Sequence, residues 1–257
     1  MSVQDLFKLE SKTAIVTGGG RGLGAVIAET YANAGVNVII CSRDMETCEQ
    51  MAKKLEQKYK VNTLALACDV TDSNQVQKVV DKSVERFGTI DILVNNSGAS
   101  WAAPTENMPL DAWNKVMNVN VTGTFLMSQA VGKVMIKQKR GKIINIASTA
   151  GLGGTPPFMQ TIAYNTSKGA IITFTKDLAV KWGKYHINVN AIAPGFIPTK
   201  MSKVLIEHFE DKILENTPLG RLGRNEDLKG AAIFLASDAS DYVTGDVLKV
   251  DGGGHAL

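Results

Sequence analysis

The chain has 257 residues and a formal net charge of +3, and 44% of its residues are hydrophobic while 21% are charged. These proportions are typical of a globular protein and exclude extensive disorder. The positive charge is small and no basic run is dense, so nucleic-acid binding is not indicated. The three cysteines, Cys41, Cys48 and Cys68, follow no disulfide or zinc-site spacing.

The termini and apolar runs predict a cytoplasmic protein that does not enter membranes. The N-terminal stretch "MSVQDLFKLESK" carries charges and lacks the apolar core of a secretory signal. The longest uncharged run, 143–167, is interrupted by glycines and prolines and is not typical of a membrane span. The length suits one large domain, and no repeat or linker divides the chain. We therefore expect a single domain over 1–257.

Short apolar runs rich in β-branched residues alternate with longer amphipathic runs, as in a parallel sheet covered on both faces. Helices are expected at 25–35, 44–59 and 72–87, in a long stretch toward 139, and at 162–184. The expected strands, in chain order, are 13–17, 36–41, 62–70, 90–95, 141–148, 187–194 and 246–253. This alternation predicts an α/β fold, a Rossmann-type doubly wound parallel sheet of about seven strands flanked by helices.

The stretch "TGGGRGLG", 17–24, lies between the first strand and the first helix, where such a fold binds a dinucleotide. Gly18 permits a tight turn, Gly22 lets the backbone approach the pyrophosphate, and Gly24 lets the helix pack close to the sheet. The N–H groups and the positive dipole end of the helix would then face the phosphates. A plain tight turn is the alternative for a glycine-rich segment, but the strand and helix on either side favour phosphate binding.

The spacing TGxxxGxG resembles that of the short-chain dehydrogenase/reductase family, and further motifs of this family follow in order along nearly the whole chain. They are "DV" at 69–70, "NNSG" at 95–98 (usually NNAG in the family), "NVNVTGTF", "NIAST", "YNTSK" and "PGFIPT". The chain looks most like the 3-oxoacyl-(acyl-carrier-protein) reductase group of the family. The resemblance implies cofactor contacts from Gly18, Arg21, Gly22, Leu23, Gly24, Ser42, Arg43, Asp69, Val70, Asn96, Ser97, Gly98, Tyr164, Lys168, Pro194, Gly195, Ile197 and Thr199.

Tyr164 and Lys168 are four residues apart on a predicted helix and so share one face. Because an ammonium favours a neighbouring phenolate, we expect Lys168 to lower the pKa of Tyr164 and make it a general acid/base. In carbonyl reduction Tyr164 would protonate the oxygen that Ser148 hydrogen-bonds, while hydride reaches the carbon. The resemblance adds that Lys168 binds the nicotinamide ribose and that Asn120 holds a water of the proton relay.

Each of these residues has a simpler interpretation when taken alone. A Tyr/Lys pair is usually a surface contact, a serine at a strand end is usually only polar, and an asparagine is often a capping or buried amide. Their combination after a dinucleotide loop favours catalysis. A hydrolase is disfavoured because Ser148 is not in GxSxG, and no carboxylate/histidine cluster suggests a metal. The alternative from a different functional class is a non-catalytic NADP(H)-binding sensor. The presence of all four residues, Asn120, Ser148, Tyr164 and Lys168, argues against it.

The expected ribose-binding position, about 20 residues past the glycines, falls on Ser42, with Arg43 next to it. Neither accepts both ribose hydroxyls as a carboxylate would, whereas both can donate to a 2′-phosphate. Arg21 adds a second cation, and guanidinium groups pair well with phosphate. The sequence therefore predicts NADP(H). Asp44 is the competing residue, since a shift of one or two positions could bring its carboxylate to the ribose.

The substrate side is predicted from fewer residues. Trp101, Phe158 and Phe196 are expected in the substrate pocket, and 196–217 resembles the variable lid of the family. Apolar lid residues either line an acyl pocket or form the buried face of a helix; they are Met201, Val204, Leu205 and Phe209. The expected substrate is a 3-oxoacyl thioester, and the alternative activity is that of a sugar-acid or polyol dehydrogenase such as gluconate 5-dehydrogenase.

Two kinds of protein contact are also expected. An acyl carrier protein would need a basic patch at the mouth of the site, for which Lys137, Lys139 and Arg140 are candidates; a solvated helix end is the alternative. The helix that carries Tyr164 has apolar residues on more than one side, including Ile171, Phe174 and Leu178. A helix covering a sheet needs only one apolar face. The surplus, with the family resemblance, predicts a homotetramer.

Overall fold

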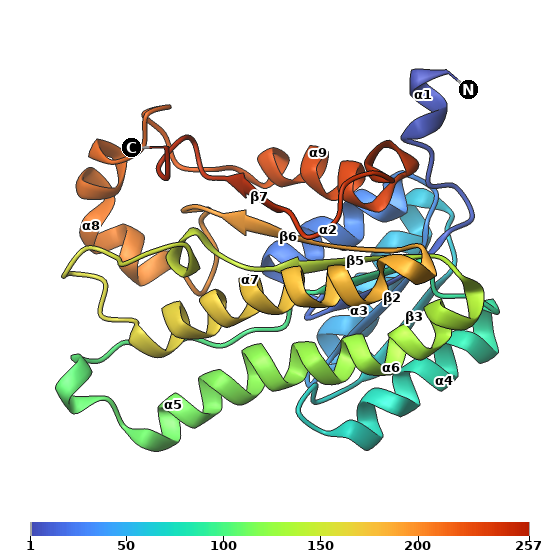
Figure 1. Cartoon of the computed structure of the whole chain (residues 1–257), viewed down its shortest axis with the longest axis horizontal. Helices are drawn as coiled ribbons and strands as arrows, with labels where there is room; N and C mark the ends of the chain where they lie inside the picture. Colours follow the sequence, from blue (N-terminus) through green and yellow to red (C-terminus); the bar gives the residue numbers. More distant parts are fainter. Residues whose placement is uncertain (1, 257) are drawn as a thin grey trace.

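The computed structural model of the chain describes residues 2–256. Within them seven parallel strands form one sheet in the order β3-β2-β1-β4-β5-β6-β7 (Figure 1). The strands are β1 (Thr13–Thr17), β2 (Asn37–Ser42), β3 (Thr63–Ala67), β4 (Ile92–Asn95), β5 (Gly141–Ile146), β6 (Ile187–Pro194) and β7 (Val247–Val250). The order reverses direction between β1 and β4, which is the switch point of a doubly wound sheet. The expected Rossmann-type fold is confirmed.

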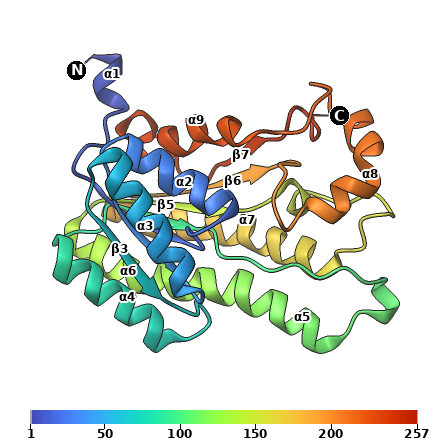
Figure 2. The ribbon, with the colours of Figure 1, turned by 180° about the vertical axis from the view of Figure 1, so that it is seen from behind.

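Helices cover both faces of the sheet, as the opposite views in Figures 1 and 2 show. One face is covered by α2 (Gly22–Asn33), α3 (Met45–Tyr59) and α9 (Asn225–Ala236). The other is covered by α4 (Ser73–Phe87), α6 (Gly123–Gln138) and α7 (Ile162–Trp182).

Successive strand residues point to opposite faces. Val16 and Ile40 therefore pack under α2 and α3, while Ile15 and Ile39 pack under α4 and α6. All four of these side chains are fully buried. Burial on both faces explains why the strands are almost wholly apolar in sequence.

The starts and ends of α3 and α4 follow from local chemistry. The side chain of Asp44 accepts a hydrogen bond from Thr47 N at the start of α3, and that of Asp72 accepts from Asn74 N and Gln75 N at the start of α4. The two helices end where Lys60 and Gly88 adopt the left-handed conformation. Acidic N-caps and a left-handed residue at the C-terminus are common helix boundaries. Both helices lie within one residue of their predicted range.

Several shorter elements complete the fold. The long helix expected toward Lys139 is divided into α5 (Leu110–Met117), a π-helical turn η2 (Asn118–Thr122) and α6. Two helices, α1 (Val3–Leu6) and α9, were not predicted from the sequence. The remaining elements are α8 (Lys203–Glu215) and the 3₁₀ turns η1 (Thr105–Asn107), η3 (Thr149–Gly151), η4 (Gly183–Tyr185) and η5 (Asp238–Ser240).

Because all seven strands are parallel, their carboxyl ends lie along one side of the sheet, which we call the carboxyl edge. The opposite side, where the amino ends of the strands lie, is called the amino edge. The loops after β1, β4, β5 and β6 lie at the carboxyl edge, and α8 lies beyond it (Figure 1). Ligands of doubly wound folds bind at this edge. No helix within residues 2–256 has both the length and the apolar character needed to cross a bilayer.

Candidate active site

The loop between β1 and α2 has the shape that a pyrophosphate needs. Gly18 and Gly22 have φ angles of +64° and +56°, a region that other residues rarely adopt. A Cβ atom at Gly24 would lie 2.4 Å from Gly18 O, so only glycine allows α2 to approach the loop this closely. The position at Gly22 is open, and the N-cap residue Arg21 makes no side-chain capping bond. An open, uncapped helix N-terminus fits an anionic group.

The loop after β4 is tied to the end of β1 at the switch point. The Thr17 hydroxyl accepts hydrogen bonds from Asn96 N and Ser97 N, both at 2.9 Å. Asn96 Nδ2 donates to Thr17 O at 2.9 Å. A Cβ at Gly18 would lie 3.3 Å from Ser97 Oγ, so the glycine loop and the "NNSG" loop are in contact. Thr17 was not identified as a positioning residue, although its place at the end of the first strand was a signal.

The end of β2 brings Ser42 next to the start of α3. Ser42 Oγ donates to Asp44 O at 3.0 Å. Asp44 Oδ1 accepts from Thr47 N at 3.1 Å and Oδ2 accepts from Thr47 Oγ1 at 2.6 Å. These bonds and, to a smaller extent, the Arg21 guanidinium hold the pKa of Asp44 below its ordinary value. Both carboxylate oxygens are thus engaged in the helix cap, and this geometry does not favour ribose binding by Asp44. The adjacent Arg43 is exposed.

The "DV" pair follows β3 and packs beside the start of α6. Asp69 Oδ1 accepts hydrogen bonds from Thr71 N and Thr71 Oγ1 at 3.0 and 2.8 Å. Val70 is buried, and a Cβ at Gly123 would lie 2.6 Å from its Cγ2 atom. The glycine therefore allows α6 to approach the end of β3.

Asn120 is buried in the π-helical turn between α5 and α6. Its Oδ1 accepts from Ala99 N at 2.7 Å, and its Nδ2 donates to Ala99 O at 2.9 Å and to Ser167 Oγ at 2.8 Å. Ser167 Oγ donates in turn to Tyr164 O at 2.7 Å. Asn120 thus links the loop after β4 to the first turns of α7. π-helical turns are frequent at functional sites. Ser167, inside "YNTSK", was not among the site residues predicted from the sequence.

Ser148, Tyr164 and Lys168 meet at the carboxyl end of β5. Tyr164 and Lys168 lie one turn apart on α7, with Lys168 Nζ 5.5 Å from the centre of the Tyr164 ring. Lys168 Nζ donates to the backbone oxygen of Ile146, the last residue of β5. The Ser148 hydroxyl accepts from Ala150 N at 3.2 Å and is close enough to Tyr164 to influence its ionisation.

The two titratable groups are shifted mainly by burial. Burial lowers the pKa of Lys168 to about 8, from an ordinary value of 10.5. Burial raises the pKa of Tyr164 above its ordinary value, while the hydrogen bond with Ser148 acts in the opposite direction. The expectation that Lys168 lowers the pKa of Tyr164 is therefore wrong in this structure. The ammonium donates to a carbonyl and does not reach the phenol oxygen as a hydrogen-bond partner.

The segment after β6 folds back beside this group. Thr149 Oγ1 donates to Pro194 O at 3.4 Å, which places Pro194 next to the loop after Ser148. A Cβ at Gly195 would lie 2.8 Å from the Cα of Asp251, so glycine is needed there. Ile197 is buried and Thr199 N donates to Ser202 Oγ at 2.9 Å. The "PGFIPT" motif thus lies at the carboxyl edge, as expected.

The residues predicted for the substrate pocket are distributed over three loops. Trp101 is 45% exposed in the loop before η1. Phe196 is partly buried, and its backbone oxygen accepts from Gly223 N at 2.9 Å. Phe158 stacks on Phe209 of α8 with ring centres 4.6 Å apart. Among the described residues the structure gives no aromatic contact that joins the three.

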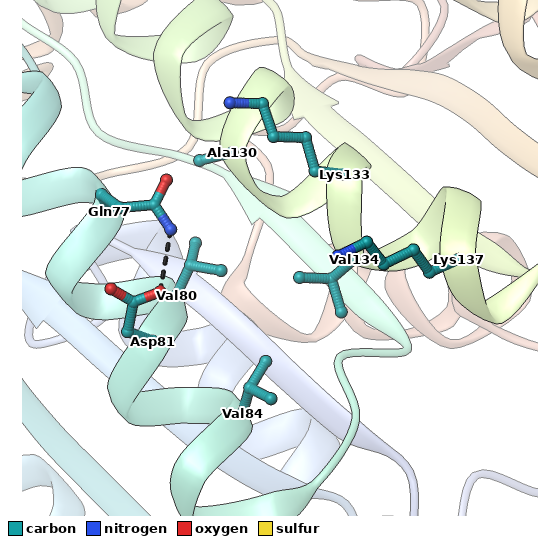
Figure 3. A pocket seen from close by; sticks show the side chains of 8 residues that line it. All are labelled: Gln77, Val80, Asp81, Val84, Ala130, Lys133, Val134 and Lys137. Carbon is teal, nitrogen blue, oxygen red and sulfur yellow. Dashed lines mark hydrogen bonds between the residues drawn. The ribbon is translucent and has the colours of Figure 1, made fainter.

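The basic residues proposed for carrier-protein docking lie at the wrong edge of the sheet. Lys139 and Arg140 immediately precede β5, at its amino end, and Arg140 pairs with Asp91 at 3.1 Å. Lys137 lines a surface groove of about 330 Å³ between α4 and α6 (Figure 3). The groove contains none of the predicted site residues; it is lined by Gln77, Val80, Asp81, Val84, Ala130, Lys133, Val134 and Lys137. The expectation that this patch could flank the mouth is therefore wrong.

Known proteins match this arrangement of motifs along the whole chain. A family model described as enoyl-(acyl-carrier-protein) reductase matches residues 18–255. The 3-oxoacyl-(acyl-carrier-protein) reductase of Aquifex aeolicus is 39% identical over 246 residues, which are 96% of this chain and 98% of that protein. The crystal structure of a short-chain type dehydrogenase/reductase from Mycobacterium marinum superposes with a TM-score of 0.95 at 36% identity, over 100% of both chains. The chain belongs to the short-chain dehydrogenase/reductase family.

This short-chain dehydrogenase/reductase is equally similar to an enzyme named for a different substrate. A gluconate 5-dehydrogenase from Burkholderia cenocepacia, solved in complex with NADP and tartrate, has a TM-score of 0.95 and 37% identity over 100% of both chains. The chain is thus an oxidoreductase that uses a nicotinamide cofactor and acts on CH–OH or C=O groups. Relatives named for acyl and for sugar-acid substrates match it at similar identity, so identity alone does not choose between these substrates.

Proposed function

We propose that the chain is an NADPH-dependent carbonyl reductase in which Tyr164 donates the proton. The observation that carries this proposal is the meeting of Ser148, Tyr164 and Lys168 at the carboxyl end of β5. Carbonyl reduction requires a hydride at carbon and a proton at oxygen, and a positioned side chain accelerates the proton transfer. When bound, the reduced nicotinamide supplies the hydride.

Each of the four side chains has a separate role in the proposed reaction. The raised pKa of Tyr164 keeps the phenol protonated at neutral pH, so it is ready to donate to the carbonyl oxygen. Ser148 hydrogen-bonds the same oxygen and stabilises the negative charge that develops on it. Lys168, with a pKa of about 8, gains and loses a proton near neutral pH. The side chain of Asn120 is engaged by Ala99 and Ser167, which supports a role in holding α7 in place.

The cofactor proposal assigns each part of NADP(H) to residues at the carboxyl edge. Gly18, Gly22 and the start of α2 receive the pyrophosphate. Arg21, Ser42 and Arg43 receive the 2′-phosphate, and the engagement of Asp44 by Thr47 supports this choice over NAD. The NADP in the Burkholderia cenocepacia neighbour agrees with it. By family resemblance the adenine lies at Asp69 and Val70, and the nicotinamide half lies along Asn96, Ser97, Gly98, Pro194, Gly195, Ile197 and Thr199.

For the substrate we propose a 3-oxoacyl thioester. The Aquifex aeolicus relative supports it. The second candidate is a keto-sugar acid, supported by the gluconate 5-dehydrogenase neighbour. The carrier protein is not part of the proposal, since Lys139 and Arg140 lie at the amino edge.

The test is the initial rate of NADPH oxidation with a 3-oxoacyl thioester and with 5-ketogluconate, in the wild type and in Tyr164→Phe. Turnover of the thioester that is lost in the variant supports the proposal. Turnover of the keto acid alone moves the assignment to the second candidate. NADPH binding without turnover of any carbonyl contradicts catalysis and favours the sensor hypothesis.

We also propose that the chain assembles as a homotetramer. Exposed apolar side chains lie on two neighbouring helices, with Phe125 44% exposed on α6 and Val180 84% exposed on α7. Such side chains are common at subunit interfaces. Light scattering that gives the mass of one chain would contradict this assembly.

A further inference from the structure

Two segments that are far apart in the sequence meet beyond the candidate site through a pair of aromatic rings. The segment 152–161, here called the strap, connects the loop after Ser148 to the start of α7. Phe158 of the strap and Phe209 of α8 stack with ring centres 4.6 Å apart and an interplanar angle of 29°. Figures 1 and 2 both show the strap running beside α8 at the end of the molecule where the carboxyl edge lies.

A cation strengthens this contact. Lys212 Nζ lies 5.5 Å from the ring centre of Phe158 and 5.8 Å from that of Phe209. An ammonium over an aromatic face within about 6 Å is attracted by the ring quadrupole. Because Lys212 and Phe209 both belong to α8, the two residues together hold the strap residue Phe158.

The strap has few other attachments. Asn165 of α7 holds it at two places, since its Nδ2 donates to Thr155 Oγ1 at 2.7 Å and its Oδ1 accepts from Thr161 Oγ1 at 3.0 Å. The end of the strap is held to the Trp101 loop by the hydrogen bond from Ala103 N to Gln160 O, 2.9 Å.

The other end of the strap contains two unconfined glycines, since a Cβ at Gly153 or Gly154 would meet no atom within 4 Å. Such glycines place few steric limits on the backbone at that end of the strap.

The partner helix α8 is also divided at the contact. Phe209 has φ −136° and ψ 20°, which are not helical angles, so the helix bends at this residue. On either side of it Ile206 and Ile213 are buried and anchor the helix. The stacked ring thus lies at the bend between two anchored turns.

We propose that Phe158, Phe209 and Lys212 form an aromatic latch that holds the strap and α8 together across the substrate mouth and limits the size of the carbonyl substrate. The size limit rests on the proposed reductase function, whereas the latch itself does not. An aromatic stack and two cation–π contacts favour the closed form by roughly tenfold to hundredfold. A short substrate fits behind the closed latch. A substrate with a long acyl chain binds only when the latch is open, so its KM is higher than that of a short substrate.

The first experiment measures amide hydrogen exchange in the strap, which needs no substrate. In Phe209→Ala the strap amides, including those of Met159 and Thr161, should exchange about tenfold faster or more, and in Lys212→Met about threefold faster. Val204→Ala is the matched control, because Val204 is 65% exposed on the same helix. It should leave strap exchange unchanged. Unchanged exchange in both latch variants, or the same acceleration in the control, would overturn the latch.

The second experiment measures kcat and KM for a 3-oxobutanoyl and a 3-oxododecanoyl thioester of N-acetylcysteamine. The ratio of kcat/KM, long over short, should rise about tenfold in Phe209→Ala, mainly through a lower KM for the long substrate. Phe158→Leu, which keeps apolar bulk, should raise it less. An unchanged ratio with faster strap exchange overturns the size limit. If the wild type reduces no thioester, the proposed substrate is wrong, and the exchange experiment still decides the latch.

Discussion

Two buried lysines at opposite ends of β5 have different partners. At the amino edge, Lys142 is 8% exposed and its Nζ donates to Asp241 Oδ1 at 2.7 Å. At the carboxyl edge, Lys168 is 5% exposed and donates to the uncharged oxygen of Ile146. Buried charges are ordinarily paired, because desolvation of an ion costs several kcal/mol. Burial lowers the pKa of both lysines, but only Lys142 has a carboxylate that acts against the shift.

Other ion pairs lie at both edges of the sheet. The amino edge holds further ion pairs, Arg140 with Asp91 at 3.1 Å and Lys12 with Asp238 at 3.2 Å. At the carboxyl edge Arg221 and Asp227 also form an ion pair, at 2.7 Å, whereas the buried side chains of Asn120 and Ser167 are joined by a hydrogen bond between neutral groups. Strongly perturbed pKa values cluster at functional sites, and that of Lys168 is lowered to about 8. We therefore expect Lys142 at the amino edge to contribute mainly to stability, and Lys168 at the carboxyl edge to belong to the proposed catalytic site.

The largest expected effect tests the chemistry at the carboxyl edge. Tyr164→Phe removes the proposed proton donor, so kcat should fall about 10³-fold while NADPH still binds. Steady-state NADPH oxidation and a fluorescence titration of the cofactor measure the two quantities. Since the substitution removes only the hydroxyl of a partly exposed residue, the free energy of unfolding should change by about 1 kcal/mol or less. A variant that retains turnover would show that the proton comes from another group.

The second prediction compares the two lysines directly. The folded-state pKa of Lys168 is about 8, against 10.5 in the ordinary state, so at pH 7 its charge opposes folding by up to about 3 kcal/mol. Between pH 8 and pH 10.5 Lys168 is neutral in the folded protein but still protonated in the unfolded chain, so stability rises with pH in this range. The cost is therefore complete below pH 8, decreases toward pH 10.5, and disappears above that value. Lys168→Met should therefore stabilise the protein at pH 7, less so at pH 10, and abolish most activity.

Urea unfolding at the two pH values measures this gain. Lys142→Met is the matched comparison, since it leaves Asp241 without its partner and should stabilise the protein less. A destabilised Lys168→Met would mean that the bond to Ile146 outweighs the desolvation of the ammonium, and the contrast between the edges would fail.

The third prediction concerns Arg43, an exposed cation beside the end of β2. Arg43→Ala should raise the Kd for NADPH about tenfold or more, because a charged hydrogen bond to phosphate is worth about 1.5–3 kcal/mol. The Kd for NADH should change less than about twofold, since NADH lacks the 2′-phosphate. Arg86→Ala, an exposed arginine on α4, is the control. Equal losses for both cofactors would contradict the assignment of Arg43 to the phosphate.

Local chemistry in the sequence predicts much of the fold and of the site. The sixth strand was expected at 187–194 and lies at Ile187–Pro194, since an apolar run ends there at a proline and a glycine. The cap formed by Asp44 and Thr47 was also open to prediction, because an acidic residue before a helix commonly caps it. An Asp44 carboxylate engaged in this cap is not free to bind the ribose.

What the sequence did not predict depends on tertiary packing. The raised pKa of Tyr164 results from burial, which the spacing of Tyr164 and Lys168 does not show. The stack of Phe158 on Phe209 joins residues 51 positions apart (209 − 158) and follows no local period. The ion pair between Lys142 and Asp241 also joins residues that are far apart in the sequence, so no local pattern predicts it. It indicates a structural role for Lys142.

The smallest expected effect tests that structural role. Asp241→Ala removes the carboxylate that most strongly opposes the lowering of the Lys142 pKa, so this pKa should fall further, with only the weaker effect of Asp238 left against burial. Because Asp241 is 66% exposed, solvent screens the pair, and the loss of stability at pH 7 should be about 1 kcal/mol or less. As pH rises through the pKa of Lys142, the difference from wild type should vanish, since a neutral amine needs no counter-ion. Unfolding measured at pH 7 and pH 10, with kcat unchanged at pH 7, supports the division between the edges; a large fall in kcat would show that the amino edge also acts on the reaction.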